Sequence, residues 1–263
     1  LSAGLHACAT APITDRRQLK LIPESKLNAQ AAQLYEQVKQ KAKLSDDKES
    51  LDKIIGIGSK IETSITEYFY KNNMEDPTVN FSWEYILIDN KKVKNAWCMP
   101  GGKIVFYTGI LPIADGEAGI AAIMGHEVAH ALANHGQQRM SAGQLQALGA
   151  VAGNLALSKD PKNQQIFNQA YGIGSTVGVM LPFSRSHESE ADQIGLYLMA
   201  IAGYDPIEAA DLWRRMKANS GGQAPPEFLS THPSSDTRIN NITNWAPQAK
   251  AEARKFGVTT FKK

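Results

Sequence analysis

His126-Glu127-Val128-Ala129-His130 is the most informative stretch of this 263-residue chain. It lies within residues 114–133, where apolar residues recur at the spacing of a helix. Two histidines four positions apart on a helix share one face, where both imidazoles can bind the same metal ion. Glu127 can then take a proton from a water at that metal. The stretch predicts a zinc site on a helix. Two ordinary core histidines would leave the glutamate in this apolar helix unexplained.

A catalytic zinc usually has three protein ligands, so one more must lie elsewhere in the chain. The pattern HExxHxxGxxH would supply a histidine, but Ala133 and Gly136 stand where its Gly and last His would be. On a continuous helix His135 lies about 180° from the first histidine, so we expect it to be only a polar residue at a helix end. Residues 131–159 contain no Asp or Glu, which excludes a glutamate ligand shortly after the motif.

The next candidate ligands lie in residues 184–192, with the sequence SRSHESEAD. Glu188 and Asp192 are four positions apart and share a helix face that small and apolar residues continue. Glu190 points about 200° away from that face and is not expected to affect the metal. We therefore expect Glu188 to be the third ligand and Asp192 to accept a hydrogen bond from a ligating histidine. An exposed acidic helix start is the alternative.

Three motifs together resemble the HtpX-like and CAAX-prenyl-endopeptidase family of zinc metallopeptidases. The family pattern is HExxH, a later ExxAD and then HPxxxxRI, and here the last is THPSSDTRI at residues 231–239. Residues 95–104, NAWCMPGGKI, resemble the segment before the family's first active-site helix. The resemblance covers residues 81–241. It implies a gluzincin fold, peptidase activity, and one zinc ion held by His126, His130 and Glu188.

In the implied mechanism Glu127 is the general base, and another group must stabilise the tetrahedral oxyanion. His232 and Arg238 are candidates for that catalytic role by resemblance. The residues alone would make His232 a residue before a Pro-started helix, and Arg238 a partner of Asp236 or Asp192. His232 could also approach the open zinc position and restrain activity.

The chain pattern predicts an α+β protein that is mostly α. Residues 1–23 look like a tail, and residues 24–263 like a single zinc metallopeptidase domain. We expect helices over residues 24–43 and 45–72, the second capped by Ser45-Asp46-Asp47. Strands are expected over residues 78–88, 93–99 and 104–107, with Asp89-Asn90-Lys91 turning the chain between the first two. From Ala114 onward the pattern is helical, and Ser184 or Ser186 can cap a new helix. The small sheet should lie beside the active-site helix.

The segment before Pro100 suits the edge of that sheet. Proline cannot donate to a strand ladder, so residues 95–99 are expected on an outer strand. An exposed edge can hold an extended peptide by strand addition. Asn95, Ala96 and Trp97 are therefore the candidate substrate-binding residues.

Composition narrows the function classes. The chain is long enough for a sizeable core in one domain or at most two. Its net charge of +2 argues against a dedicated nucleic-acid binder, so proteins or peptides are the expected substrates. No run of about 18 apolar residues is present, so we expect no spanning helix. Residues 148–157 and 170–183 come closest, and close helix packing is the expected explanation for both.

The two cysteines are Cys8 and Cys98, and a disulfide between them is not expected. Leu5-His6-Ala7-Cys8 resembles a bacterial lipobox, although His6 replaces the usual small residue. The chain starts at Leu1 without a basic region, as after loss of a signal peptide. We expect lipidation of Cys8 and a location in the cell envelope, in the periplasm and tethered to a membrane. Cleavage after Ala9 and an unprocessed tail are the alternatives.

The expected function is a zinc-dependent endopeptidase that acts on misfolded or envelope proteins. One alternative is a membrane-tethered, chaperone-like binding factor with a restrained metal site, and another is a zinc hydrolase of a non-peptide substrate. The presence of Glu127 favours an enzyme, because binding alone needs no general base.

Overall fold

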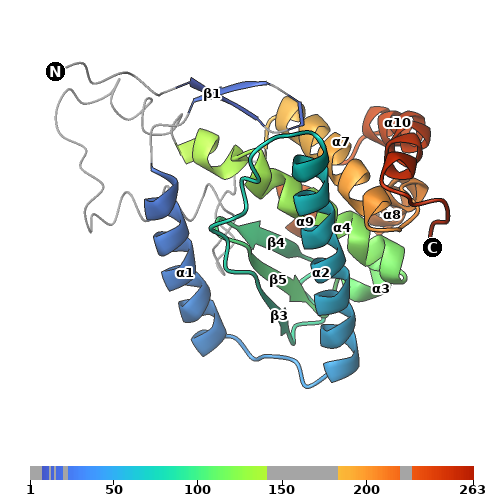
Figure 1. Cartoon of the computed structure of the whole chain (residues 1–263). Helices are drawn as coiled ribbons and strands as arrows, with labels where there is room; N and C mark the ends of the chain where they lie inside the picture. Colours follow the sequence, from blue (N-terminus) through green and yellow to red (C-terminus); the bar gives the residue numbers. More distant parts are fainter. Residues whose placement is uncertain (1–7, 12, 15, 20–22, 141–182, 220–226) are drawn as a thin grey trace, which may run out of the picture.

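The computed structural model describes residues 8–11, 13–14, 16–19, 23–140, 183–219 and 227–263 (Figure 1). Several helices and one three-stranded sheet form its body, in agreement with the expected mostly α, α+β class. The apolar stretches at residues 148–157 and 170–182 lie outside the described residues. In chain order the described elements are β1 (Cys8–Thr10), β2 (Arg17–Leu19), α1 (Glu24–Lys41), α2 (Lys48–Lys71), β3 (Glu84–Ile88), β4 (Ala96–Met99), β5 (Lys103–Tyr107), α3 (Leu111–Ala114), α4 (Glu117–Leu132), α7 (Arg185–Ile201), α8 (Ile207–Ala218), α9 (Glu227–Thr231) and α10 (Asp236–Lys255).

Side-chain caps fix where three of these helices begin. Asp47 caps α2 by accepting a hydrogen bond from the backbone nitrogen of Ser50 at 3.0 Å. Ser184 caps α7, with a distance of 3.2 Å to the nitrogen of His187. Ser235 caps α10 in the same way. Each cap satisfies a backbone donor that the first helical turn leaves free, so these polar residues set the starting points of the helices.

The strand order of the main sheet is β3-β5-β4. β3 pairs with β5 in parallel, and β4 pairs with β5 antiparallel. The turn at residues 89–91 connects β3 to β4, but these two strands are not paired with each other. β5 lies between them in the sheet. The hairpin joins β4 to β5 instead, where Gly101 and Gly102 both have φ of +78°. Glycine adopts this left-handed backbone without strain. Among the residues that the structure describes, β4 is an outer strand, as the proline argument predicts.

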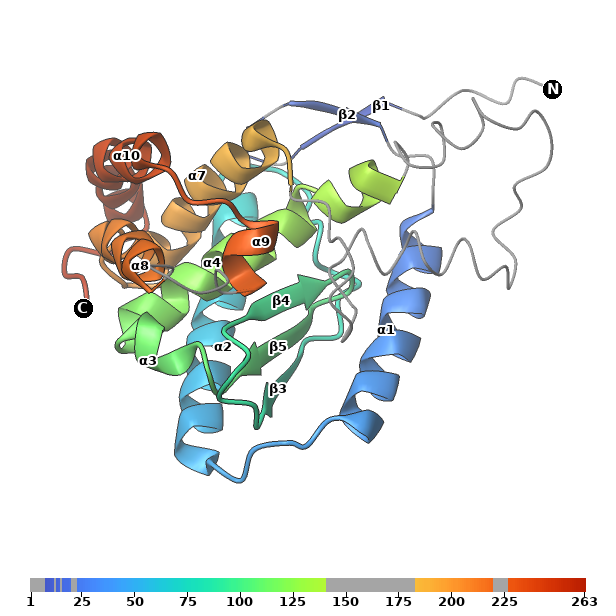
Figure 2. The ribbon, with the colours of Figure 1, turned by 180° about the vertical axis from the view of Figure 1, so that it is seen from behind.

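Alternate side chains of the sheet enter two different hydrophobic clusters, as the two-residue period of a strand requires. The first cluster packs this sheet against α2 and α4, and the second packs it against α1. The helix α2 lies in front of the sheet in Figure 1 and behind it in Figure 2. The sheet contributes Leu87, Ala96, Cys98, Ile104 and Phe106 to the first cluster, and Ile86, Ile88, Trp97, Met99 and Val105 to the second.

The helix α4 runs through the centre of the molecule and contacts α2, α3, α7, α8 and β4. Nearly all of its residues are buried, which explains why its sequence is apolar on every side. Its closest neighbour is α7, and the two helices meet at Gly125 and Gly195. A Cβ atom on Gly195 would lie only 2.9 Å from the backbone nitrogen of His126. The glycine pair thus lets α7 approach the part of α4 that carries the histidines.

Part of the segment that looks like a tail has a defined structure. β1 and β2 form an antiparallel hairpin, with Cys8 opposite Leu19. Ala11 in the connection belongs to the main hydrophobic cluster and is 1% exposed. The hairpin is therefore packed on the body of the protein. Within the described residues, no helix is both long and apolar enough to cross a membrane.

Candidate metal centre

The two motif histidines lie on α4 with their side chains directed at one another. The Nε2 atoms of His126 and His130 are 3.1 Å apart, and each residue is 4% exposed. One helical turn separates the two residues, so the helix alone determines this proximity.

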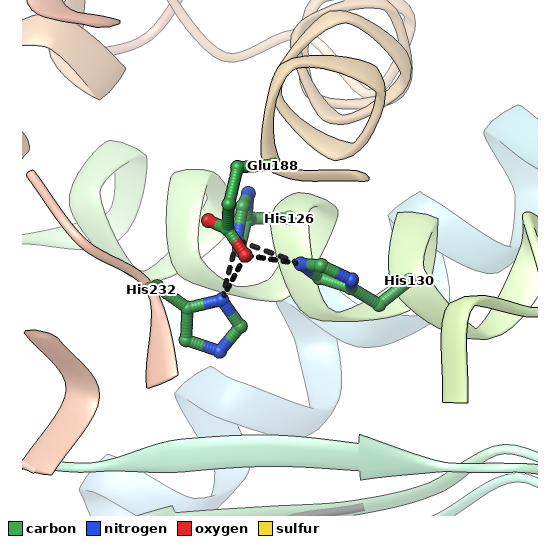
Figure 3. Close-up of side chains that lie close together, drawn as sticks. All are labelled: His126, His130, Glu188 and His232. Carbon is green, nitrogen blue, oxygen red and sulfur yellow. Dashed lines mark hydrogen bonds and ion pairs between the residues drawn. The ribbon is translucent and has the colours of Figure 1, made fainter. Parts of the chain in front are cut away.

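Two further donors reach the same point from other elements. The carboxylate of Glu188 comes from the first turn of α7, and His232 directly follows α9. Oε1 of Glu188 lies 2.9 Å from Nδ1 of His232 and 3.4 Å from Nε2 of His130. Nδ1 of His232 is 3.1 Å from Nε2 of His126. Figure 3 shows the four side chains converging, and one donor atom from each lies within 4.8 Å of the others.

His126, His130 and His232 each have a second ring nitrogen that points away from the cluster, called here the outer nitrogen. Each outer nitrogen faces a polar partner. Nδ1 of His126 is 3.0 Å from Oδ1 of Asp192, and Nε2 of His232 is 3.3 Å from Oε1 of Glu127. Nδ1 of His130 is 2.9 Å from a nitrogen of His135. A neutral imidazole keeps its proton on the nitrogen that faces an acceptor. With the three rings neutral, as metal binding requires, the inner nitrogens present lone pairs toward one another and toward a carboxylate, which suits a bound cation.

The spacing of these donors fits zinc. Donors bound tetrahedrally at the usual zinc distance of about 2.0–2.1 Å would lie about 3.3 Å apart. Four donor pairs have separations from 2.9 to 3.4 Å, and the wider pairs stay within 4.8 Å. Nitrogen donors with one carboxylate oxygen are also ligands that zinc accepts. The residues present therefore fit a zinc ion.

Arg238 and Asp192 form a buried layer behind the donors. The guanidinium of Arg238 donates to both carboxylate oxygens of Asp192, at 2.6 and 2.7 Å. Its Nη1 atom also lies 2.7 Å from Oε2 of Glu188, and the guanidinium stacks on the ring of Trp213. Burial alone would raise the pKa of Glu188, but His232 and Arg238 hold that pKa well below its usual range. Glu188 is therefore an anion.

Glu127 lies beside this cluster and has few partners of its own. The residue is 4% exposed, and the partner of its Oε1 atom is Nε2 of His232, at 3.3 Å. Burial raises the pKa of its carboxyl above the usual value, and the neighbouring His232 and His126 oppose that rise. A buried carboxylate with a raised pKa is a better proton acceptor near neutral pH than an ordinary glutamate.

A pocket connects the cluster with the edge of the sheet. Its wall includes Asn95, Ala96 and Trp97 together with Glu127 and His232. The remaining lining residues described are Cys98, His130, Ala131, Gly136, Arg139, Phe183 and Thr231. In Figure 2, α9 lies over β4, and Phe228 in α9 donates its backbone N–H to the carbonyl of Lys94 at 3.2 Å. The structure therefore brings all three candidate substrate-binding residues to the pocket beside Glu127.

Sequence reasoning missed the position of His135 and the contact that Glu190 makes with it. The helix α4 ends at Leu132, and Asn134 has a left-handed backbone with φ of +53°. A new helical segment, residues 135–140, starts after that break. A helical projection drawn through the break misplaces His135, which is 0% exposed and contacts both His130 and Glu190. Asn134 followed by Gly136 was the available sign, since both residues favour helix ends.

Neither cysteine is among the four converging donors found in the described residues. Cys8 starts β1, and nothing is described of its side chain. Cys98 is a buried free thiol on β4, and burial raises its pKa well above the usual value. The Cys98 thiol is therefore neutral and a weak candidate for a metal ligand.

Comparison with known proteins gives a consistent result. The family described as Peptidase family M48 matches residues 59–246, more than half of the chain. The chain is 38% identical over 174 residues to "Mitochondrial metalloendopeptidase OMA1" of Schizosaccharomyces pombe, which covers 66% of this chain and 49% of that protein. For the Saccharomyces cerevisiae protein of the same name, identity is 34% over 193 residues, with 70% and 54% covered. Identity to "Beta-barrel assembly-enhancing protease" of Escherichia coli (strain K12) is 27% over 178 residues, covering 66% and 36%. The chain thus spans about half the length of the first two relatives and less of the third.

Proposed function

The chain belongs to peptidase family M48, a family of zinc metallopeptidases, and we propose that it is a zinc-dependent endopeptidase that hydrolyses peptide bonds of protein substrates. The observation that carries the proposal is the convergence of four buried donors beside Glu127 and a pocket at the sheet edge. In this proposal residues 24–263 form one peptidase domain. Its support is the three-stranded sheet, which joins a cluster that includes Ile54, Ile123 and Ala253 to a second cluster that includes Leu27 of α1.

We assign His126, His130 and Glu188 as the ligands of one zinc ion per chain. The support is the distance between their donor atoms and the anionic state of Glu188. When bound, zinc polarises the scissile carbonyl and lowers the pKa of water to about 7. The protein holds the three donors in place before the metal arrives, because they come from two helices that cross at a glycine pair.

Glu127 is the general base of the proposed reaction. Its carboxylate takes the proton of the attacking water and delivers it to the leaving amine nitrogen as the peptide bond breaks. The position of this buried carboxyl beside the metal-site donors and its raised pKa support the role.

Asp192 and Arg238 act behind the ligands in this proposal. Asp192 accepts from Nδ1 of His126 and so keeps the lone pair of that ring on Nε2. Arg238 was a candidate oxyanion donor by resemblance. Its guanidinium is engaged with Asp192, Glu188 and the carbonyl of Pro233, so we propose that it positions the two carboxylates.

Substrate binding is proposed at β4. As the outer strand next to the pocket, β4 can pair with an extended peptide, and Asn95, Ala96 and Trp97 would line that peptide. An extended chain is the form that unfolded or misfolded proteins offer. Misfolded or envelope proteins are therefore the proposed substrates.

His232 lies where it could act as a fourth zinc ligand and so limit catalytic activity. Its Nδ1 atom lies with the ligand atoms at the spacing of a fourth donor. A catalytic zinc keeps one position for water, whereas four protein donors make a closed site. We propose that His232 restrains activity and withdraws when substrate enters. A chaperone-like binding factor with a permanently closed site would need the same donors, but the peptidase relatives do not favour that alternative.

The location is also a proposal. The lipobox-like Leu5-His6-Ala7-Cys8 supports a lipid on Cys8 and a place in the periplasm, tethered to a membrane. The relatives differ, since one name refers to mitochondria and another to β-barrel assembly. Mass spectrometry of the protein purified from bacteria would detect acyl chains on the peptide that contains Cys8, and Cys8→Ser should remove them. An unmodified Cys8 in the wild-type protein would reject the lipid anchor.

The test of the activity uses the full 263-residue chain with zinc and unfolded casein as substrate. Wild-type protein should cleave casein and lose activity on chelation. Glu127→Gln should keep its zinc but lose proteolysis, because the amide fills the space without accepting the proton. Glu188→Ala should lower zinc occupancy strongly. Casein cleavage by Glu127→Gln, or full zinc occupancy in Glu188→Ala, would contradict the assignment.

A further inference from the structure

His130 has two ring nitrogens, and each faces a different part of the protein. Its Nε2 atom lies among the metal-site donors, 3.1 Å from Nε2 of His126. Its Nδ1 atom lies 2.9 Å from Nδ1 of His135. On the far side of His135, Nε2 is 2.8 Å from Oε2 of Glu190. All three residues are buried, so a continuous row of polar groups leads away from the metal site.

The N-terminal hairpin completes this row. The hydroxyl of Thr14 donates to Oε1 of Glu190, and Nε of Arg16 donates to Oε2 at 2.6 Å. Arg16 is itself held by a hydrogen bond from Nη1 to Oε1 of Gln138, at 2.9 Å. Thr14 and Arg16 lie in the connection between β1 and β2, more than 170 residues from Glu190 in sequence. The carboxylate is therefore fixed between α7 and the hairpin.

The positions of the ring protons determine the direction of these hydrogen bonds. If Nε2 of His130 offers its lone pair to the metal, the ring proton must lie on Nδ1. That proton is donated to Nδ1 of His135, which leaves the proton of His135 on Nε2, facing Glu190. Thr14 and Arg16 also donate to the carboxylate of Glu190, so this carboxylate is the acceptor at the end of the row.

We propose that His135 and Glu190 are positioning residues for His130, and that Thr14 and Arg16 make the N-terminal hairpin part of the metal site. The row fixes the tautomer and the ring orientation of one ligand from outside the donor group. It parallels Asp192, which serves His126 from the opposite side. The inference rests on the proposed function in one respect, because it takes His130 to be a metal ligand. A purely structural role, in which these contacts only fasten the hairpin, is the competing explanation.

Zinc affinity separates these two explanations. The dissociation constant would be measured for the full chain by competition with a chromogenic zinc chelator, without any substrate. His135→Phe keeps a ring of similar shape but removes both hydrogen bonds, and should weaken zinc binding by about 10–100-fold. Glu190→Gln should weaken it less, because the amide oxygen still accepts one bond. Glu117→Gln is the matched control, since that glutamate pairs with Lys262 near the other end of α4 and should leave affinity unchanged.

A double variant tests whether the two residues act through one route. His135→Phe with Glu190→Gln should bind zinc no more weakly than His135→Phe alone, because the first change already breaks the row. Fully additive losses would overturn the proposal, and so would an unchanged dissociation constant in folded His135→Phe. Arg16→Met tests the role of the hairpin even if the variants of the buried residues do not fold, because Arg16 is partly exposed. This change should weaken zinc binding several-fold. Unchanged affinity in Arg16→Met would then reject the role of the hairpin. Absence of zinc binding by the wild-type chain would instead reject the proposed function.

Discussion

The backbones of Gly125 and Gly195 touch where α4 crosses α7. A Cβ atom on Gly125 would lie 2.9 Å from the carbonyl oxygen of Gly195, and one on Gly195 would lie 2.9 Å from the nitrogen of His126. Real Cβ atoms do not come so close to backbone atoms. Glu188 and Asp192 precede Gly195 on the same side of α7, so this contact sets how deeply both carboxylates reach toward the histidines. The distance between ligands from two helices thus depends on two residues that have no side chain.

Gly195→Ala is expected to destabilise the protein and to weaken zinc binding. The added methyl group forces α4 and α7 apart, at a cost of about 1–3 kcal/mol for overpacking, which exceeds the helix-propensity gain of up to about 1 kcal/mol. Urea denaturation and zinc titration would measure the two effects. Gly56→Ala in the exposed face of α2 is the control, because a Cβ there meets nothing within 4 Å. It should raise stability by roughly 0.5–1 kcal/mol and leave zinc binding unchanged. Equal effects of the two substitutions would show that the crossing tolerates a side chain.

Asp192→Asn is expected to lower zinc affinity and activity by about 10–100-fold, because the neutral amide is a weaker acceptor for His126. The same change leaves the buried guanidinium of Arg238 with less compensation, so stability should also fall. Zinc titration and thermal unfolding of the same preparation would measure the two losses.

Asp205→Asn provides the control for losing a buried carboxylate away from the metal. Asp205 is 7% exposed and pairs with Lys250 at 2.8 Å. Its substitution should reduce stability without changing zinc affinity. Wild-type zinc affinity and turnover in Asp192→Asn would make Asp192 a structural residue only.

The pairing of the proposed site residues along each helix could be predicted from the sequence because it depends on local periodicity. Spacings of four residues put His126 above His130 and Glu188 above Asp192 on any helix. The caps at Asp47 and Ser184 were equally local, since each is a polar side chain directly before a helical pattern. Such features need no knowledge of the rest of the chain.

The features that sequence reasoning missed depend on distant or irregular backbone. The pairing of β3 with β5 joins strands that are not consecutive, and no period in the sequence encodes which neighbour a strand chooses. His135 was misplaced because Asn134 leaves the helical conformation. The contact of Arg16 with Glu190 spans most of the chain, and neither residue lies in a recognisable motif. Long-range contacts of single side chains therefore remain outside what periodicity can predict.

The buried Lys103 makes stability depend on pH through Glu84. Lys103 is 5% exposed and donates to Glu84 at 2.5 Å. This hydrogen bond lowers the pKa of the Glu84 carboxyl below its usual value of 4.5. A group whose pKa is lowered by folding stabilises the protein above its unfolded pKa, and the contribution disappears as pH falls through the folded pKa. Because Glu84 is more than a third exposed, the contribution should be at most about 1 kcal/mol.

Glu84→Gln should therefore reduce the free energy of unfolding at pH 7 but not at acid pH. Urea denaturation of both proteins from pH 7 down to below the usual glutamate pKa would follow the difference. The matched variant is Glu36→Gln, which removes a more exposed partner of Lys39 and should have little effect at any pH. A difference between wild type and Glu84→Gln that stayed constant over the whole range would exclude the proposed linkage.

His232→Ala is expected to raise proteolytic activity several-fold while zinc remains bound. Nδ1 of His232 lies 2.9 Å from Oε1 of Glu188 and 3.1 Å from Nε2 of His126, at the spacing of a fourth donor. Three protein donors suffice for a catalytic zinc, so removal of the fourth opens a position for water. The change also frees Oε1 of Glu127 from its neighbour Nε2 of His232. Casein turnover and zinc content would be measured together on the purified variant, with Thr231→Ser as a control in the same turn. A loss of turnover at full zinc occupancy would mean that His232 assists the reaction, as an oxyanion donor would, instead of restraining it.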